Sequence, residues 1–204
     1  MFTENEIGAL ILDPHIKEST DKLKQDFIEE EAPYLEISDH DFLSLILLTP
    51  SVGIALATSG ISLMEEMALN KKARKYSKGG YFLKKDPVVN AMGYLIKHYD
   101  VWSEIFYAQL KKLIWLMLDK DELMNSNIDA PDVTDEQYCV ELLKAPFVLV
   151  RFISSFLSNS EAEDLSVSKK IGSKEYDRTI EILEKVDLIN IPLVKRHLIK
   201  LVVK

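Results

Sequence analysis

Seven basic side chains and no acidic one gather in residues 71–85 (KKARKYSKGGYFLKK), which we call the basic segment. Ammonium and guanidinium groups at this density can bind phosphates, and rings such as Tyr76, Tyr81 and Phe82 can stack on bases. The candidate anion-binding positions are the basic residues and the glycine pair between them, namely Lys71, Lys72, Arg74, Lys75, Lys78, Gly79, Gly80, Lys84 and Lys85. The glycine pair matches no phosphate-binding or dinucleotide-binding motif.

A solvated surface is the competing interpretation of the basic segment, and we favour it. Runs of like charge are usually solvated faces, and bases near the end of a helix suit its dipole. The chain has a net charge of −8, so the residues outside the basic segment carry −15. Residues 1–41 alone hold twelve acids and three lysines, which provides an internal or intersubunit partner. An acidic chain also disfavours general nucleic-acid binding.

Two further polar residues stand in apolar surroundings. Arg151 is the lone charge in residues 145–158 (APFVLVRFISSFLS), so it needs a carboxylate partner or access to water. We expect a structural ion pair, for which Asp100 and Glu104 are examples of a partner, and binding of an anionic ligand in a cavity is the alternative. His98 shares a helical face with Tyr94 and Trp102, which predicts a buried, hydrogen-bonded histidine in the core or at an interface.

Metal and cofactor chemistry finds little support in the sequence. The ligand positions of a calcium-binding loop are matched by Asn125, Asn127, Asp129 and Glu136. However, Ala130 stands where the sharp turn of such a loop needs glycine. The four histidines are scattered, and Cys139 has no second cysteine that could share a metal. We therefore expect no metal and no cofactor, and no constellation of residues argues for an enzyme.

The elements that position these residues centre on residues 42–64, a run without any charge in a chain that is 28% charged. We call it the neutral run. Thr49 and Pro50 resemble a cap followed by the first helical position, which predicts helices over 40–48 and 50–77. The run is long enough to span a membrane. Its acidic flanks and the predicted break favour instead a central core helix over residues 50–77.

Cap signals divide the rest of the chain into helices. They occur at Thr3, Asp13, Ser38, Asp86 and Thr134. The helical pattern from residue 87 to 118 has no glycine or proline break after residue 93, so we expect one long helix with any kink at residues 98–101. The last two helices are predicted to end near residues 186 and 203. No stretch shows the alternation typical of a strand.

These patterns predict an all-α protein, a multi-helix bundle of roughly seven to nine helices around the central apolar helix. Few glycines and prolines, seven of each, favour long helices over many short strands. We expect a single domain over residues 1–204. A small C-terminal helical subdomain over residues 173–204 is possible after a polar loop at 159–172.

The sequence favours a soluble, cytoplasmic, non-catalytic protein-interaction or structural module. A single cysteine and the absence of a secretory signal agree with the cytoplasm. We expect a homodimer, because the neutral run and the long helix need cover. The alternatives are an anionic-ligand or nucleic-acid-binding protein that uses the basic segment, and a membrane-associated protein that uses the neutral run. Nucleic acid and membrane are the less favoured partners.

Overall fold

A computed structural model describes residues 1–58, 60–79, 85–125, 128, 133–157 and 169–204. Within these residues the chain forms eleven helices and two short strands, which confirms the all-α prediction with more helices than expected. The helices are α1 (Glu4–Leu10), α2 (Pro14–Glu31), α3 (Asp39–Ala55), α4 (Leu63–Tyr76), α5 (Pro87–Lys97), α6 (Tyr99–Met117), α7 (Lys120–Met124), α8 (Asp135–Lys144), α9 (Phe147–Leu157), α10 (Ser173–Lys185) and α11 (Pro192–Ile199).

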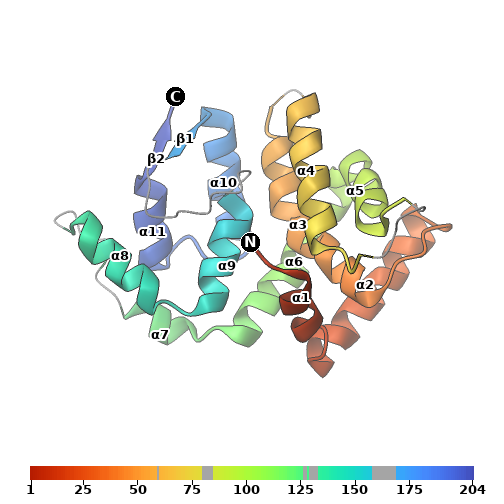
Figure 1. Ribbon diagram of the computed structural model, residues 1–204, viewed down its shortest axis with the longest axis horizontal. Helices are drawn as coiled ribbons and strands as arrows, with labels where there is room; N and C mark the ends of the chain where they lie inside the picture. Colours follow the sequence, from red (N-terminus) through yellow and green to blue (C-terminus); the bar gives the residue numbers. More distant parts are fainter. Residues whose placement is uncertain (59, 80–84, 126–127, 129–132, 158–168) are drawn as a thin grey trace.

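Helix α3 is the centre of the molecule, and it contacts α1, α2, α4, α5, α6, α9 and α10. Every residue of α3 from His40 to Ala55 is buried. Figure 1 shows this helix in orange, beside α4 and between the elements of the two ends of the chain. A helix that is apolar on all sides needs neighbours on all sides. The prediction of a central apolar helix is confirmed, although its bounds are different.

The predicted helix over residues 50–77 is wrong. Pro50 lies inside α3, which begins at its cap Ser38 and continues to Ala55. A proline inside a helix removes one hydrogen bond and costs about 3 kcal/mol, but burial against seven neighbouring helices outweighs this cost. Residues 56–62 then connect α3 to α4, which is a separate helix.

Glycine is required where α3 meets α6. A Cβ atom on Gly53 would lie only 2.2 Å from the Tyr99 hydroxyl oxygen and 2.7 Å from that of Tyr107. These two hydroxyl groups are 2.5 Å apart and share a hydrogen bond. Burial raises the pKa of both tyrosines, that of Tyr107 well above its ordinary value. Rings from α2, α3 and α6 also pack together, with centroids 5.0–5.9 Å apart.

The predicted long helix over residues 87–118 is divided. His98, with φ −119° and ψ 31°, ends α5 and precedes α6, so the break falls in the segment where a kink was expected. Other predicted helix starts are confirmed by their caps. Thr3 and Thr134 form capping boxes, and a side-chain oxygen of Asp13 accepts two backbone N–H groups of α2. Side chains of these types reach N–H groups two or three residues ahead.

The C-terminal part contains two elements that the sequence did not predict. Helix α11 ends at Ile199 rather than near residue 203. Strand β2 (Leu201–Val203) then pairs in parallel with β1 (Lys169–Ile171). The β-branched pair Val202 and Val203 suits an extended strand. Each strand has only three residues, too few to show an alternating pattern.

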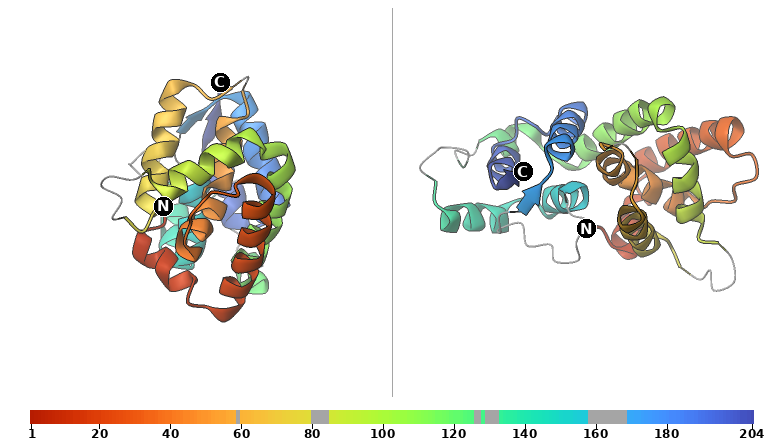
Figure 2. Two further views of the ribbon diagram at one scale, coloured as in Figure 1. Left: turned by 90° about the vertical axis from the view of Figure 1, so that its right-hand side faces the viewer. Right: turned by 90° about the horizontal axis from the view of Figure 1, so that it is seen from above.

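The two ends of the molecule are built from different parts of the chain. Figure 2 shows α2, α4 and α5 at one end and α8, α11 and the strands at the other, with α6 running between them. Helices α9 and α10 connect the ends because both contact α3. Among the residues that the structure describes, no helix combines the length and apolar character that crossing a membrane requires.

Candidate functional site

Helix α4 exposes a row of side chains that we call the α4 face. It comprises Leu63, Met64, Met67, Lys71, Arg74 and Lys75. The apolar side chains are 72%, 76% and 60% exposed, in chain order. The face is therefore apolar along the first turns of the helix and basic along the last. Lys78 follows directly and is also exposed.

The N-terminus of α4 is set by a capping box. The Ser62 hydroxyl oxygen accepts from the Glu65 backbone N–H at 3.3 Å, and the Glu65 carboxylate accepts from the Ser62 backbone N–H at 2.7 Å. Acidic residues in the first turn and basic residues in the last both suit the helix dipole. A new helix therefore begins within the neutral run, although residues 61–64 carry no charge.

Lys72 lies on the opposite side of α4 and is buried. Its ammonium donates to the Ser51 hydroxyl of α3 at 2.6 Å and to the backbone carbonyl of Ser155 in α9. That carbonyl lies in the last turn of α9, where carbonyls lack partners within the helix and a cation is favoured. The Ser51 hydroxyl donates to the same carbonyl at 3.1 Å. Lys72, one of the predicted anion-binding candidates, is thus a structural tie between three helices, and its burial separates it from the exposed bases of the segment.

Tyr76 is a second buried tie. Its hydroxyl donates to the Ser155 hydroxyl at 3.0 Å, and its carbonyl accepts from the Ser44 hydroxyl at 2.9 Å. Because the ring is buried, Tyr76 is not available to stack on a base. Tyr81 and Phe82, the other aromatic residues of the basic segment, lie outside the described residues.

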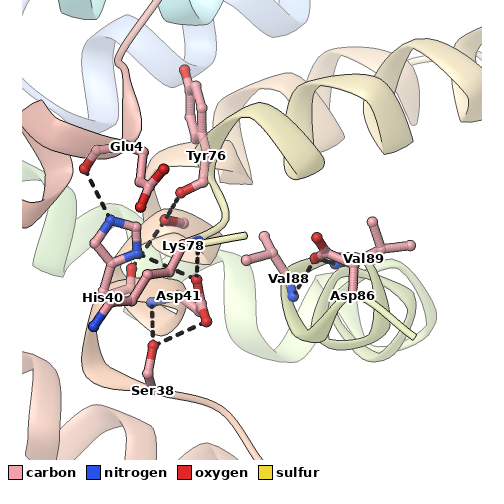
Figure 3. A network of polar contacts seen from close by, with 10 residues as sticks. Glu4, Ser38, His40, Asp41, Tyr76, Lys78, Asp86, Val88 and Val89 are labelled. Atoms are coloured by element: carbon pink, nitrogen blue, oxygen red, sulfur yellow. Dashed lines mark hydrogen bonds and ion pairs between the residues drawn. The ribbon is translucent and has the colours of Figure 1, made fainter. Parts of the chain in front are cut away.

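A buried carboxylate fixes the chain where it leaves α4. Asp41, in the first turn of α3, accepts the Lys78 backbone N–H at 2.9 Å and the Ser38 hydroxyl at 3.0 Å (Figure 3). Its neighbour His40 contacts the same carboxylate at 3.3 Å and the Glu4 carbonyl at 3.0 Å. This network joins α1, α3 and the middle of the basic segment.

The sequence did not reveal the role of Asp41. A buried carboxylate that accepts several hydrogen bonds is a typical loop anchor. Its partner is the backbone of a residue 37 positions away, so no local spacing marks the pair. The only local signal is an acid next to a histidine at a predicted helix start, and many exposed helix starts carry acids as well.

Arg151 forms the structural ion pair that was expected, although with a different carboxylate, whereas His98 departs from its prediction. Arg151 donates through Nε and Nη2 to one carboxylate oxygen of Glu6, at 3.1 and 3.0 Å, and its guanidinium stacks on the Phe147 ring. Its partner is thus neither Asp100 nor Glu104. His98 is 46% exposed in its side chain and lies 3.4 Å from the Glu31 carboxylate, so it is not a buried residue.

The remaining candidates do not converge on one site. Gly79 has a φ of +76°, which glycine adopts without strain, and Lys85 is exposed. Gly80 and Lys84 lie outside the described residues, as do Asn127 and Asp129 of the calcium-like spacing. Asn125 and Glu136 line a cavity of about 560 Å³ beside α8. In the described part of the chain, no three histidine, cysteine or acidic side chains are placed to hold a metal ion.

The buried pair Lys72 and Ser51 has the groups of a general base and a nucleophile. However, both side chains are enclosed by α3, α4 and α9. Neither lines the 560 Å³ cavity beside α8 or a second cavity of about 200 Å³ among α7, α8, α9 and α11. A reacting group must reach its substrate. The arrangement therefore supports a structural role for the pair, and the α4 face is the surface with chemistry available to a partner.

Known proteins offer no guide to the function of this site. No protein-family model matches the chain, and neither the curated proteins nor the solved structures include one with detectable similarity. The function therefore rests on the geometry of the α4 face.

Proposed function

We propose that this protein is a non-catalytic protein-interaction module and that the α4 face is its docking surface. One observation carries the proposal: three large apolar side chains lie side by side and exposed at the start of α4. Exposed apolar patches bordered by charged groups mark interaction sites in folded proteins. Exposed apolar side chains elsewhere form smaller groups, since α6 has the pair Val101 and Ile105 and α8 the pair Val140 and Leu143, whereas α4 exposes three within five residues.

The α4 face is held in a fixed position, as a docking surface should be. The buried ties of Lys72 and Tyr76 attach α4 to α3 and α9, and Asp41 holds the backbone of Lys78. A surface that is already ordered loses little conformational entropy when it binds. This rigidity supports recognition of a partner by shape as well as by charge.

Binding of a phosphate-bearing ligand is the second candidate function. It is supported by the exposed cations Arg74 and Lys78 at one end of the face. Phosphate binding gives no role to Leu63, Met64 and Met67, and the burial of Tyr76 removes a stacking partner. The protein-interaction proposal accounts for both ends of the face, so we prefer it.

The homodimer remains a prediction. The two arguments for it, the length of the neutral run and the long helix over residues 87–118, no longer require a second subunit. The buried part of the neutral run is covered by helices of the same chain, so it does not need a second subunit. The predicted long helix over residues 87–118 is two shorter helices. A second copy is therefore one possible partner for the α4 face rather than a requirement of the fold.

Site-specific photocross-linking in the cells that make the protein tests the proposal. A photoreactive phenylalanine analogue replaces Met67 or, as a control, Tyr34, which lies between α2 and α3 and is 94% exposed. We expect a discrete protein adduct from position 67, and we expect Arg74→Glu to abolish it. The control position should give no adduct that Arg74→Glu abolishes. No adduct from position 67, or adducts that Arg74→Glu leaves unchanged, would contradict the proposal.

A further inference from the structure

We infer that the segment recognised by the α4 face is an α-helix with acidic side chains in its first turns and apolar side chains in its last turns, lying antiparallel to α4. This inference rests on the proposed function and specifies the partner. It follows from the polarity of the α4 face, from the dipoles of two neighbouring helices and from the length of α4.

The polarity of the face sets the composition of the partner. Leu63 and Met67 are one helical turn apart, and Arg74 follows Met67 by two turns on the same face. A complementary segment needs apolar side chains opposite the first pair and carboxylates opposite Arg74. Arg74 and Lys78 carry this argument, because neither side chain forms an ion pair with another described residue.

The helix dipole sets the direction of the partner. Carboxylates stabilise the first turn of a helix, and cations stabilise the last turn. An antiparallel partner places its acidic first turns beside the basic last turns of α4, so both helices carry their charges at favourable ends. A parallel partner would carry its acids at its own C-terminus, where the dipole disfavours them.

The length of α4 sets the size of the partner. Fourteen residues make a helix about 21 Å long, so a matching segment has about four turns. Recognition of an amphipathic helix by a few anchors spaced one or two turns apart is a common mode of peptide binding.

Two other occupants fit less well. Glu65 and Glu66 flank the apolar end of the face, and acids at that position repel anionic lipid headgroups. The α4 face of a second copy would bring its own bases rather than carboxylates. Helix α2 of a second copy is acidic in its last turn, at residues 29–31, so it has the opposite polarity to the segment that we infer. Helix α8 of a second copy has acids in its first turn and an exposed Leu143 in its last, but its ten residues are shorter than the fourteen of α4.

Two synthetic fluorescent peptides of four helical turns and identical composition test the inference. One carries glutamates in its first two turns and leucines in its last two, and the other has the reverse order. Titration of each with the full chain, followed by fluorescence anisotropy, should show about tenfold tighter binding of the acid-first peptide, equivalent to about 1.4 kcal/mol.

Variants assign the binding to the proposed residues. Arg74→Glu should weaken binding of the acid-first peptide by about tenfold or more, because it places a carboxylate opposite the carboxylates of the peptide. A lysine-first peptide should then prefer Arg74→Glu over the wild-type chain. Met67→Gln should also weaken binding. The control Lys112→Glu, at an exposed lysine of α6, should have no effect.

Several results would overturn the inference. Equal binding of the two peptides would contradict the antiparallel orientation, and binding that is insensitive to Arg74→Glu and Met67→Gln would contradict the surface. Binding of phosphatidylglycerol vesicles without binding of either peptide would assign the face to a membrane. Self-association that Met67→Gln abolishes would assign it to a second copy. If both peptides fail but the cross-link from position 67 persists, this inference fails and the proposed function stands.

Discussion

The two halves of the neutral run have opposite environments, although neither carries a charge. Residues 42–55 lie inside α3 and are buried on every side, whereas Leu63 and Met64 begin α4 and are largely exposed. The two segments differ in their neighbouring helices. Seven helices enclose α3, whereas α4 packs on one side of α3 and leaves its other face exposed. An uncharged run in a sequence therefore shows that its apolar side chains need to be buried. It does not show whether the same chain or a partner buries them.

The largest expected effect lies in the buried half. Gly53→Ala places a methyl group where the hydroxyls of Tyr99 and Tyr107 meet, both within 2.7 Å of its Cβ position. Overpacking of this kind costs about 1–3 kcal/mol, and we expect the upper end because the tyrosines are enclosed. Urea denaturation measures the loss.

A double-mutant cycle shows whether this contact is the cause. In the Tyr99→Phe/Tyr107→Phe background, where both hydroxyls are absent, Gly53→Ala should cost about 1 kcal/mol less than in the wild-type chain. An unchanged cost would mean that Gly53 is needed for another reason.

The next effect compares two adjacent lysines of α4. Lys72→Ala should lower the free energy of unfolding by about 2 kcal/mol, because it removes charged hydrogen bonds to the Ser51 hydroxyl and the Ser155 carbonyl. Lys71→Ala, at an exposed position on the same helix, should change it by at most about 0.5 kcal/mol. Similar losses for both would contradict the division of α4 into a tied side and an exposed face.

Local chemistry in the sequence predicted the helices, and tertiary contacts explain where those predictions failed. Asp13 and Asp86 were recognised as caps because a capping side chain acts on N–H groups two or three residues away. Pro50 was misread because its tolerance inside α3 depends on burial by helices distant in the sequence. The same local signal therefore has two meanings, and only packing decides between them.

The candidate site was predicted only in part. The basic segment was recognised from its composition, but the division between buried Lys72 and exposed Arg74 depends on which side of α4 faces α3 and α9. Leu63 and Met64 were assigned to the core because they end the neutral run, and Met67 was given no role. Arg151 was expected to have a nearer partner, yet Glu6 lies 145 positions away. Two residues so far apart in the sequence form no spacing pattern from which their contact could be predicted.

The pH dependence of the free energy of unfolding tests the tyrosine pair that packs against the buried half of the neutral run. Burial raises the pKa of Tyr99 and Tyr107 in the folded state, so the unfolded chain releases these protons first as the pH rises. Their stabilising contribution is therefore complete below about pH 10 and is lost as the pH rises above it. The free energy of unfolding should decrease more between pH 8 and pH 11 for the wild-type chain than for Tyr99→Phe/Tyr107→Phe. Equal slopes would show that other groups dominate the alkaline loss.

The smallest expected effect tests the central claim, that the apolar residues of the α4 face serve binding and not folding. The measurement is the free energy of unfolding of Leu63→Gln/Met67→Gln, with substitutions that preserve helix propensity, at two protein concentrations. We expect a change within about 0.5 kcal/mol at both concentrations. Leu47→Ala, in the buried half of the run, should cost about 3 kcal/mol under the same conditions. A loss of about 2 kcal/mol or more in the double variant, or a loss that depends on concentration, would show that the face is already covered and contradict the claim.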